Sequence, residues 1–87
     1  MTASVALTKA DIRQLLHALN DELAKQNEHG EIYVVGGAVM CLAFDAREST
    51  RDVGATFKPA ATVRAAAARV GAHAGKPASW LNDAVKA

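Results

Sequence analysis

The stretch Ile32-Tyr-Val-Val-Gly-Gly-Ala-Val-Met-Cys-Leu-Ala-Phe44 decides how the chain folds, because an apolar run stops at two glycines and then starts again. The β-branched and aromatic residues at 32–35 predict a short buried strand. Gly36 and Gly37 can turn the chain sharply and let the backbone approach a ligand without a Cβ in the way. Residues 38–44 contain no breaker and predict a helix. A glycine turn between a strand and a helix leaves N–H groups free to bind phosphate.

A second strand is predicted downstream, at Arg51-Asp-Val-Gly-Ala-Thr-Phe57. Its apolar residues alternate with Asp52, Gly54 and Thr56. Because alternate residues of a strand share a face, Asp52 and position 54 should point away from the core. A strand would hold a divalent metal ion with carboxylates at positions i and i+2. Only the first carboxylate is present here, because residue 54 is glycine.

A strand, two glycines, a helix and then an acid on the next strand resemble the DNA-polymerase-β-like nucleotidyltransferase superfamily. The chain is most similar to the small bacterial members linked to abortive-infection and toxin–antitoxin systems. The resemblance implies that Gly36 and Gly37 hold nucleotide phosphates, that Asp52 is a catalytic, metal-binding carboxylate and that Mg²⁺ is the cofactor. It covers roughly residues 32–85. The second carboxylate of the family falls at Gly54, and no candidate for the third is found.

The activity that the resemblance implies is Mg²⁺-dependent transfer of a nucleotidyl group from a nucleoside triphosphate to a hydroxyl. Such chemistry needs several carboxylates, because Mg²⁺ takes oxygen ligands in near-octahedral geometry and two ions clamp the reacting oxygens. With glycine at position 54 we expect weak binding of Mg²⁺–nucleotide and little or no catalysis. Thr50 and Arg51, together with Arg47, could contact triphosphate oxygens. A solvated loop with surface ion pairs is an equal alternative for these three residues.

Two further functions remain open from the residues alone. The first is a non-catalytic, antitoxin-like interaction module, which predicts a homo- or hetero-oligomer formed through a free strand edge and Trp80. The second is a truncated fragment without a function of its own. Trp80 has two possible roles. It starts an apolar helical face, which favours a place in the core. The alternative is an anchor for a partner, because aromatic residues are frequent at the centres of interfaces.

Composition bounds the class of protein. The 87 residues predict one domain that occupies residues 1–87. A formal charge of +1 gives no reason to expect bulk attraction to nucleic acid or to an anionic membrane. The single cysteine, Cys41, suits a reducing cytosol. No apolar run approaches the ~20 residues that span a bilayer, and the N-terminus does not resemble a signal peptide. We therefore expect a cytoplasmic protein.

Helical patterns fill the rest of the chain. Thr8 and Asp11 form a capping-box-like pair ahead of a helix predicted at Lys9–Asn27. The alanine-rich residues 60–72 predict another helix, whose pattern Gly71, Gly75 and Pro77 should interrupt. A last short amphipathic helix is predicted around Trp80, Leu81, Ala84 and Val85. The order α-β-α-β-α-α predicts an α/β (α+β) layered domain. Because two strands form a marginal sheet, a partner or a longer chain should supply a further strand.

Overall fold

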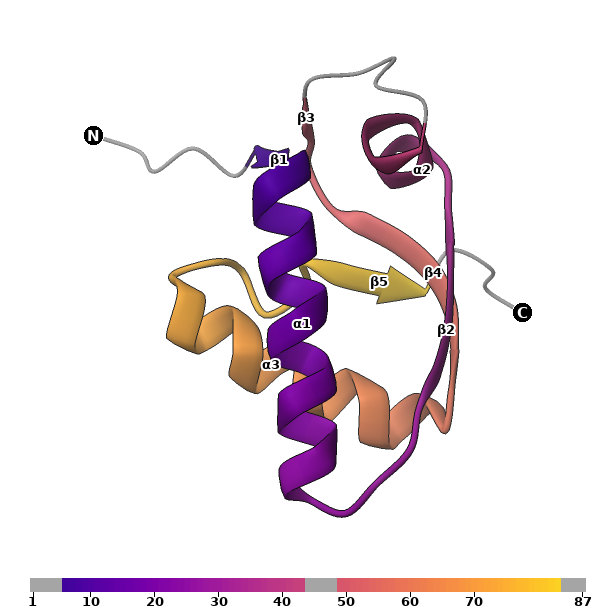
Figure 1. The fold of residues 1–87 in the computed structure, drawn as a ribbon, viewed down its shortest axis with the longest axis vertical. Coiled ribbons are helices and arrows are strands. Elements are labelled where there is room, and N and C mark those ends of the chain that lie inside the picture. The colour runs from indigo at the N-terminus through magenta and orange to yellow at the C-terminus, as the bar shows by residue number, and fades with distance from the viewer. Residues whose placement is uncertain (1–5, 44–48, 84–87) are drawn as a thin grey trace.

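The computed structural model describes residues 6–43 and 49–83, which form a small α+β domain (Figure 1). Its helices and strands follow one another in the order β1 (Leu7–Thr8), α1 (Lys9–Lys25), β2 (Glu31–Val35), α2 (Gly37–Leu42), β3 (Ser49–Thr50), β4 (Val53–Lys58), α3 (Ala60–Ala74) and β5 (Leu81–Asp83). The α+β class agrees with the sequence prediction. The predicted order of elements was incomplete, because three short strands were missed.

The main sheet is mixed and has the strand order β2-β4-β5. β4 pairs antiparallel with β2 and parallel with β5, so it is the central strand. The predicted helix after Trp80 is therefore wrong for Leu81–Asp83, which instead supply the third strand. Ala84 and Val85 lie outside the described residues. Just before β5, the N–H of Val53 donates to the carbonyl of Trp80 at 2.6 Å, and this hydrogen bond aligns β4 and β5 for pairing.

Helix α1 starts as the sequence predicts. The Thr8 side chain accepts from the Asp11 N–H at 3.2 Å, and the Asp11 carboxylate accepts from the Thr8 N–H at 3.0 Å, which completes a capping box. The helix ends at Lys25, two residues before the predicted end. None of the helices in the described part of the chain is both long enough and apolar enough to cross a bilayer.

Helix α3 runs to Ala74, so the prediction that Gly71 interrupts it was wrong. The helix ends at Gly75 in the left-handed region, a frequent helix terminator. Gly71 instead makes room for a neighbour. A Cβ built on Gly71 would lie 2.8 Å from the carbonyl oxygen of Pro77 and 2.9 Å from Cδ1 of Trp80. The glycine thus lets the segment before β5 fold back against the helix.

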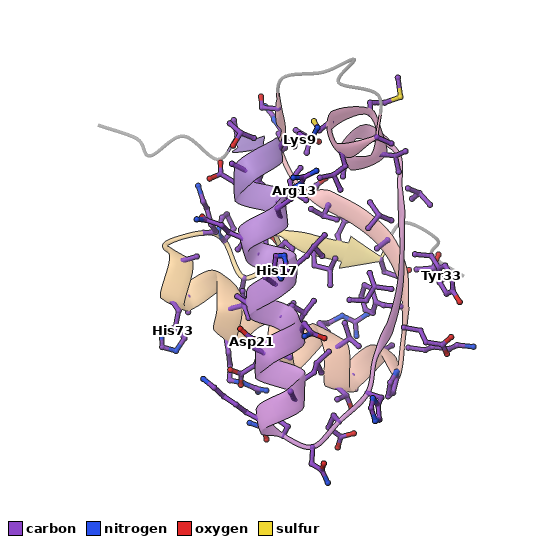
Figure 2. The ribbon with its side chains drawn as sticks, viewed as in Figure 1. Lys9, Arg13, His17, Asp21, Tyr33 and His73 are labelled. Carbon is purple, nitrogen blue, oxygen red and sulfur yellow. The ribbon has the colours of Figure 1, made fainter. Side chains whose placement is uncertain are left out.

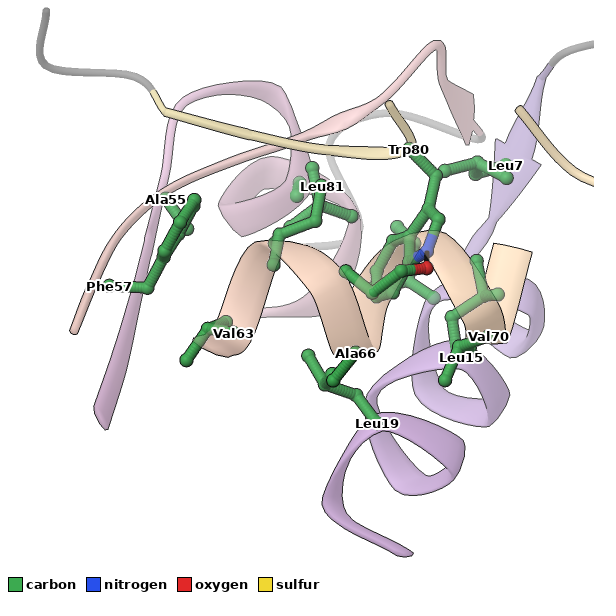
Figure 3. Packing of buried hydrophobic residues seen from close by; sticks show 14 of the residues in the cluster. Leu7, Leu15, Leu19, Ala55, Phe57, Val63, Ala66, Val70, Trp80 and Leu81 are labelled. Carbon is green, nitrogen blue, oxygen red and sulfur yellow. Dashed lines mark hydrogen bonds between the residues drawn. The ribbon is translucent and has the colours of Figure 1, made fainter. Parts of the chain in front are cut away.

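Trp80 lies at the centre of the core, which confirms the core alternative (Figure 3). Its side chain is 1% exposed, and its indole N–H donates to the carbonyl of Ala67 at 2.7 Å. Leu81 is also buried. The other alternative, with Trp80 as a surface anchor for a partner, does not fit this burial. Around Trp80 the core is formed by apolar residues of α1, α3 and the sheet, among them Leu7, Leu15, Leu19, Val63, Ala66 and Val70.

The sheet is covered by helices on one face only. Along β4, Val53, Ala55 and Phe57 are buried, whereas Thr56 and Lys58 are exposed. The predicted alternation in this segment is thus confirmed, although β4 begins at Val53 and Asp52 precedes it. The prediction of a buried strand at 32–35 was wrong for Tyr33 and Val35, which are 60% and 39% exposed, and Ile32 and Val34 are only partly buried. The apolar character of both faces of β2 suggested two covering layers, but the helices supply one.

We predict that Gly71→Ala destabilises the fold by ~1–3 kcal/mol, because the added methyl group forces Trp80 or the Pro77 backbone to move. Elsewhere in a helix the same change stabilises by ~0.5–1 kcal/mol. Urea unfolding, followed by circular dichroism and by the fluorescence maximum of Trp80, measures the effect. Ala72→Ser, at the exposed neighbouring position, is the control and should cost at most ~0.5 kcal/mol. A Gly71→Ala variant that unfolds at higher urea concentration than the native chain would contradict this packing.

Candidate functional site

The two glycines between β2 and α2 form the turn that the sequence predicts. Gly36 has φ 70° and ψ −140°, a conformation that is open almost only to glycine. Its carbonyl accepts from the N–H of Val39 at 3.1 Å and of Met40 at 3.4 Å, which starts α2. No side chain caps this end of the helix. A Cβ at Gly36 would meet nothing within 4 Å, so the space in front of the turn is open.

Asp52 lies at a bend between β3 and β4, and its side chain is exposed. The bend is held by Thr50, whose hydroxyl donates to the backbone carbonyl of Asp52 at 3.2 Å. Thr50 is held in turn by β1, because it pairs with Leu7. Arg51 is exposed beside Asp52. Of the residues predicted to contact triphosphate, Thr50 therefore has a structural role that the sequence did not predict, and Arg47 lies outside the described residues.

Strand pairing brings the glycine turn and Asp52 to the same end of the sheet. In the β2–β4 ladder, Val35 is the partner of Gly54. β2 ends at Val35 and β4 begins at Val53, so the glycine turn follows the last residue of β2 and Asp52 precedes the first residue of β4. This end of the β2–β4 pair, with the glycine turn on one strand and Asp52 on the other, is one corner of the sheet. The roles of Gly36, Gly37, Thr50, Arg51 and Asp52 in binding phosphate or metal stay predictions.

Two described aspartates lie in or next to the strands of this sheet, Asp52 before β4 and Asp83 on β5. Asp52 is one carboxylate, and Gly54 has no side chain. β5 carries a second acid, Asp83, but its partner in β4 is Ala55, whose side chain faces the core. The Asp83 carboxylate lies 3.9 Å from Nη2 of Arg64 on α3. Within residues 6–43 and 49–83, no three His, Cys, Asp or Glu side chains gather where they could hold a metal ion.

Asn82 is a polar residue of this corner that the sequence prediction missed. It is the β5 partner of Gly54, so the two share the outward face of the sheet, and it is half-buried. The prediction placed Asn82 in a helix, where it would have had no relation to Gly54. An amide oxygen at this position is a neutral ligand that can supplement one carboxylate.

A groove also lies away from this corner. A groove of about 600 Å³ between α1 and α3 is lined by acids and bases alike: Asp11, Asp21, Glu22, Lys25, His73 and Lys76. A hydrogen bond from the Thr8 N–H holds the pKa of Asp11 below its usual value, and a hydrogen bond from Arg69 does the same for Glu22. Because charges of both signs face this groove, it does not select an anion. The glycine turn and Asp52 lie on open surface outside it.

The other titratable residues remain apart from the site. His17 and His73 are exposed on α1 and α3, as Figure 2 shows, and His29 is exposed before β2. Cys41 is completely buried in α2, which agrees with a packing role.

Comparison of the chain with known protein families, with characterised proteins and with solved structures finds no match in any of the three.

The backbone of the turn can be tested with a matched pair of glycines. Gly36 and Gly75 both have φ 70°, and a Cβ at either would meet nothing within 4 Å. Gly75 has ψ 28°, in the left-handed region that other residues reach at a cost of ~1–2 kcal/mol. Gly36 has ψ −140°, where strain amounts to ~1–3 kcal/mol. We therefore expect Gly36→Ala to lower the free energy of unfolding by more than Gly75→Ala does. Equal losses in urea unfolding would contradict the strained turn.

Proposed function

We propose that this chain is a nucleotidyltransferase-like domain that binds a nucleoside triphosphate at the Gly36-Gly37 turn and has little or no transferase activity. The observation that supports the proposal is the strand register, which pairs Val35 with Gly54, so that the turn and Asp52 flank the same end of β2 and β4. A phosphate-binding turn and a carboxylate that can share its magnesium ion then lie at one corner. The family's strand–glycine–helix–strand order, which the sequence resembles, is the second support.

Binding would rest on backbone groups. No side chain caps the start of α2, and the space at Cβ of Gly36 is open; in this proposal the first N–H groups of α2 bind phosphate oxygens. Arg51, exposed beside the corner, can add a bidentate contact to a phosphate. Asp52 would face the magnesium ion that accompanies a triphosphate. One carboxylate is sufficient for this purpose, because Mg²⁺ in nucleotide sites keeps several waters and is bound by one or two carboxylates together with the phosphates.

The same corner accounts for weak or absent catalysis. Activation of an attacking hydroxyl by two metal ions needs carboxylates that bridge them. Gly54 offers no ligand, and Asp83 lies on the helix side of the sheet beside Arg64. We therefore assign no reaction step to a second ion, and the chain's own contribution is to bind and orient a triphosphate.

A second candidate function is protein interaction without chemistry, of the antitoxin-like kind. It is favoured by a different observation: Tyr33 and Val35 of β2 are 60% and 39% exposed, and both are apolar. A domain that lost its catalytic acids can keep such a surface for a partner. The two functions make separate predictions, since nucleotide binding involves the corner and partner binding involves β2.

We predict that the native chain binds Mg²⁺–ATP weakly. The Gly54→Asp variant should bind it about ten-fold more tightly, a gain of ~1.4 kcal/mol in binding free energy. The new carboxylate would stand on the outward face, two residues from Asp52, where it can share the ion. Thr56→Asp is the matched control, because it adds the same charge on the same face of β4, ~7 Å further along the strand. Isothermal titration calorimetry with and without Mg²⁺ measures all three proteins.

The outcomes separate clearly. A gain for Gly54→Asp that disappears without Mg²⁺ and is absent in Thr56→Asp supports the proposal. Equal affinities in the three proteins, or the same change of affinity in both variants, would contradict the proposal. If neither the native chain nor Gly54→Asp binds Mg²⁺–ATP, interaction without chemistry becomes the better function.

A further inference from the structure

Exposure of apolar side chains is concentrated on one strand, β2. The large apolar residues exposed among the described residues are Tyr33, Val35 and Met40, and the first two belong to β2. Ile32 and Val34, on the other face of the same strand, are only partly buried against the core. In the central strand β4, by contrast, the inward residues are fully or almost fully buried. The strand is therefore apolar on both faces, with one face exposed and the other only partly covered.

Among the described strands, β2 is also an edge of the sheet, because it pairs with β4 alone in the strand order β2-β4-β5. In Figure 1 it runs beside β4 on the right-hand side of the ribbon, with α1 and α3 to its left, and Figure 2 shows Tyr33 pointing outward. Proteins usually protect such edges with lysine, proline, a bulge or a covering segment. The residues Glu31–Val35 contain no lysine or proline, and all five continue the ladder with β4 without a bulge.

The sequence of β2 is complementary to itself when two copies run antiparallel. With Tyr33 on the two-fold axis, all five residues of each strand are paired. Tyr33 then faces Tyr33 of the second copy, an aromatic cross-strand pair of a kind that stabilises sheets. On the inward face, Ile32 of each copy faces Val34 of the other. Ile32 and Val34, which are partly buried within each copy, would thus cover one another across the pair.

Charge favours this antiparallel arrangement over a parallel one. The charged residue of β2 is Glu31, whose carboxylate lies 3.7 Å from Nζ of Lys58 on the neighbouring strand. In the antiparallel pair, Glu31 faces Val35 of the second copy, and the two glutamates are ~13 Å apart, four residues along the strand. A parallel pair would hold the two glutamates side by side in adjacent strands, where like charges are destabilising. The formal charge of +1 adds little repulsion between copies.

We propose that β2 of one chain pairs antiparallel with β2 of a second copy, centred on Tyr33, so that the two three-stranded sheets become one continuous sheet. The proposal does not depend on nucleotide binding. Pairing of one five-residue edge buries less than the ~800 Å² per partner of a standard stable interface. The dimer should therefore form and dissociate with concentration.

Sedimentation of the full chain tests the proposal. Between about 1 µM and about 1 mM, the range that corresponds to a weak interface, the average mass should rise from 9.1 kDa toward twice that value. Tyr33→Lys should remain at the monomer mass throughout, because it opposes two lysines across the axis. Thr56→Lys is the matched control, since Thr56 is the β4 partner of Tyr33 on the same exposed face, one strand in from the edge. This variant should dimerise like the native chain.

Disulfide formation tests the register even if Tyr33→Lys fails to fold. Directly opposed residues in an antiparallel pair have Cα atoms ~4.5–5.5 Å apart, within the ~4.4–6.8 Å that a disulfide spans. Tyr33→Cys should therefore cross-link two chains under mild oxidation. Thr56→Cys should not, because three strand spacings separate the two copies of residue 56, about 14 Å. Cys41 is completely buried and should not compete.

Several outcomes would overturn the proposal. These are a native chain that stays monomeric at every concentration, a Tyr33→Lys variant that dimerises as the native chain does, and a Thr56→Lys variant that loses the dimer while remaining folded. Cross-linking of Thr56→Cys as efficient as that of Tyr33→Cys would also overturn it, because the contact would then lie elsewhere.

Discussion

The position of Trp80 is the constraint on which the rest of the structure depends. Its carbonyl accepts from the N–H of Val53, its indole donates to Ala67, and its ring lies against the place where Gly71 lacks a Cβ. One residue thus joins the start of β4, the middle of α3 and the start of β5. The parallel pairing of β5 with β4 follows from this anchor, and so does the position of Asn82 beside Gly54. A small core needs such a residue, because alanine side chains bury little surface.

Much of the fold could be predicted from local sequence, but the end of the chain could not. Thr8 and Asp11 marked the start of α1, and the alternation at 53–57 marked β4, because caps and strand periodicity are local signals. Leu81–Asp83 were wrongly predicted as helical. Three residues are too few to show a helical or strand periodicity, and the packing of Trp80 decides that they form a strand. Gly71 looked like a breaker for the same reason: its neighbours in space come from beyond the helix. Burial of Trp80 was predicted, but its role in joining the sheet to α3 was not.

The candidate corner was predictable in part. Gly36, Gly37 and Asp52 were selected from the sequence, and the register from Val35 to Gly54 brings them to one end of the sheet. Thr50 was expected to face a ligand but fixes the bend at Asp52, a hydrogen bond that composition and spacing do not reveal. The exposure of Tyr33 was missed, because an apolar strand does not show how many layers cover it. The same one-sided covering leaves both the corner and the β2 edge open.

The central claim is that a triphosphate binds at the turn after β2, and amide chemical shifts measure it most directly. In a titration of ¹⁵N-labelled chain with Mg²⁺–ATP, the amides of Gly36, Gly37, Ala38 and Asp52 should shift most, and they should saturate together. The amides that line the groove between α1 and α3 should move little. Shifts confined to that groove, or unchanged amides at Gly36 and Gly37 at saturating nucleotide, would contradict the claim.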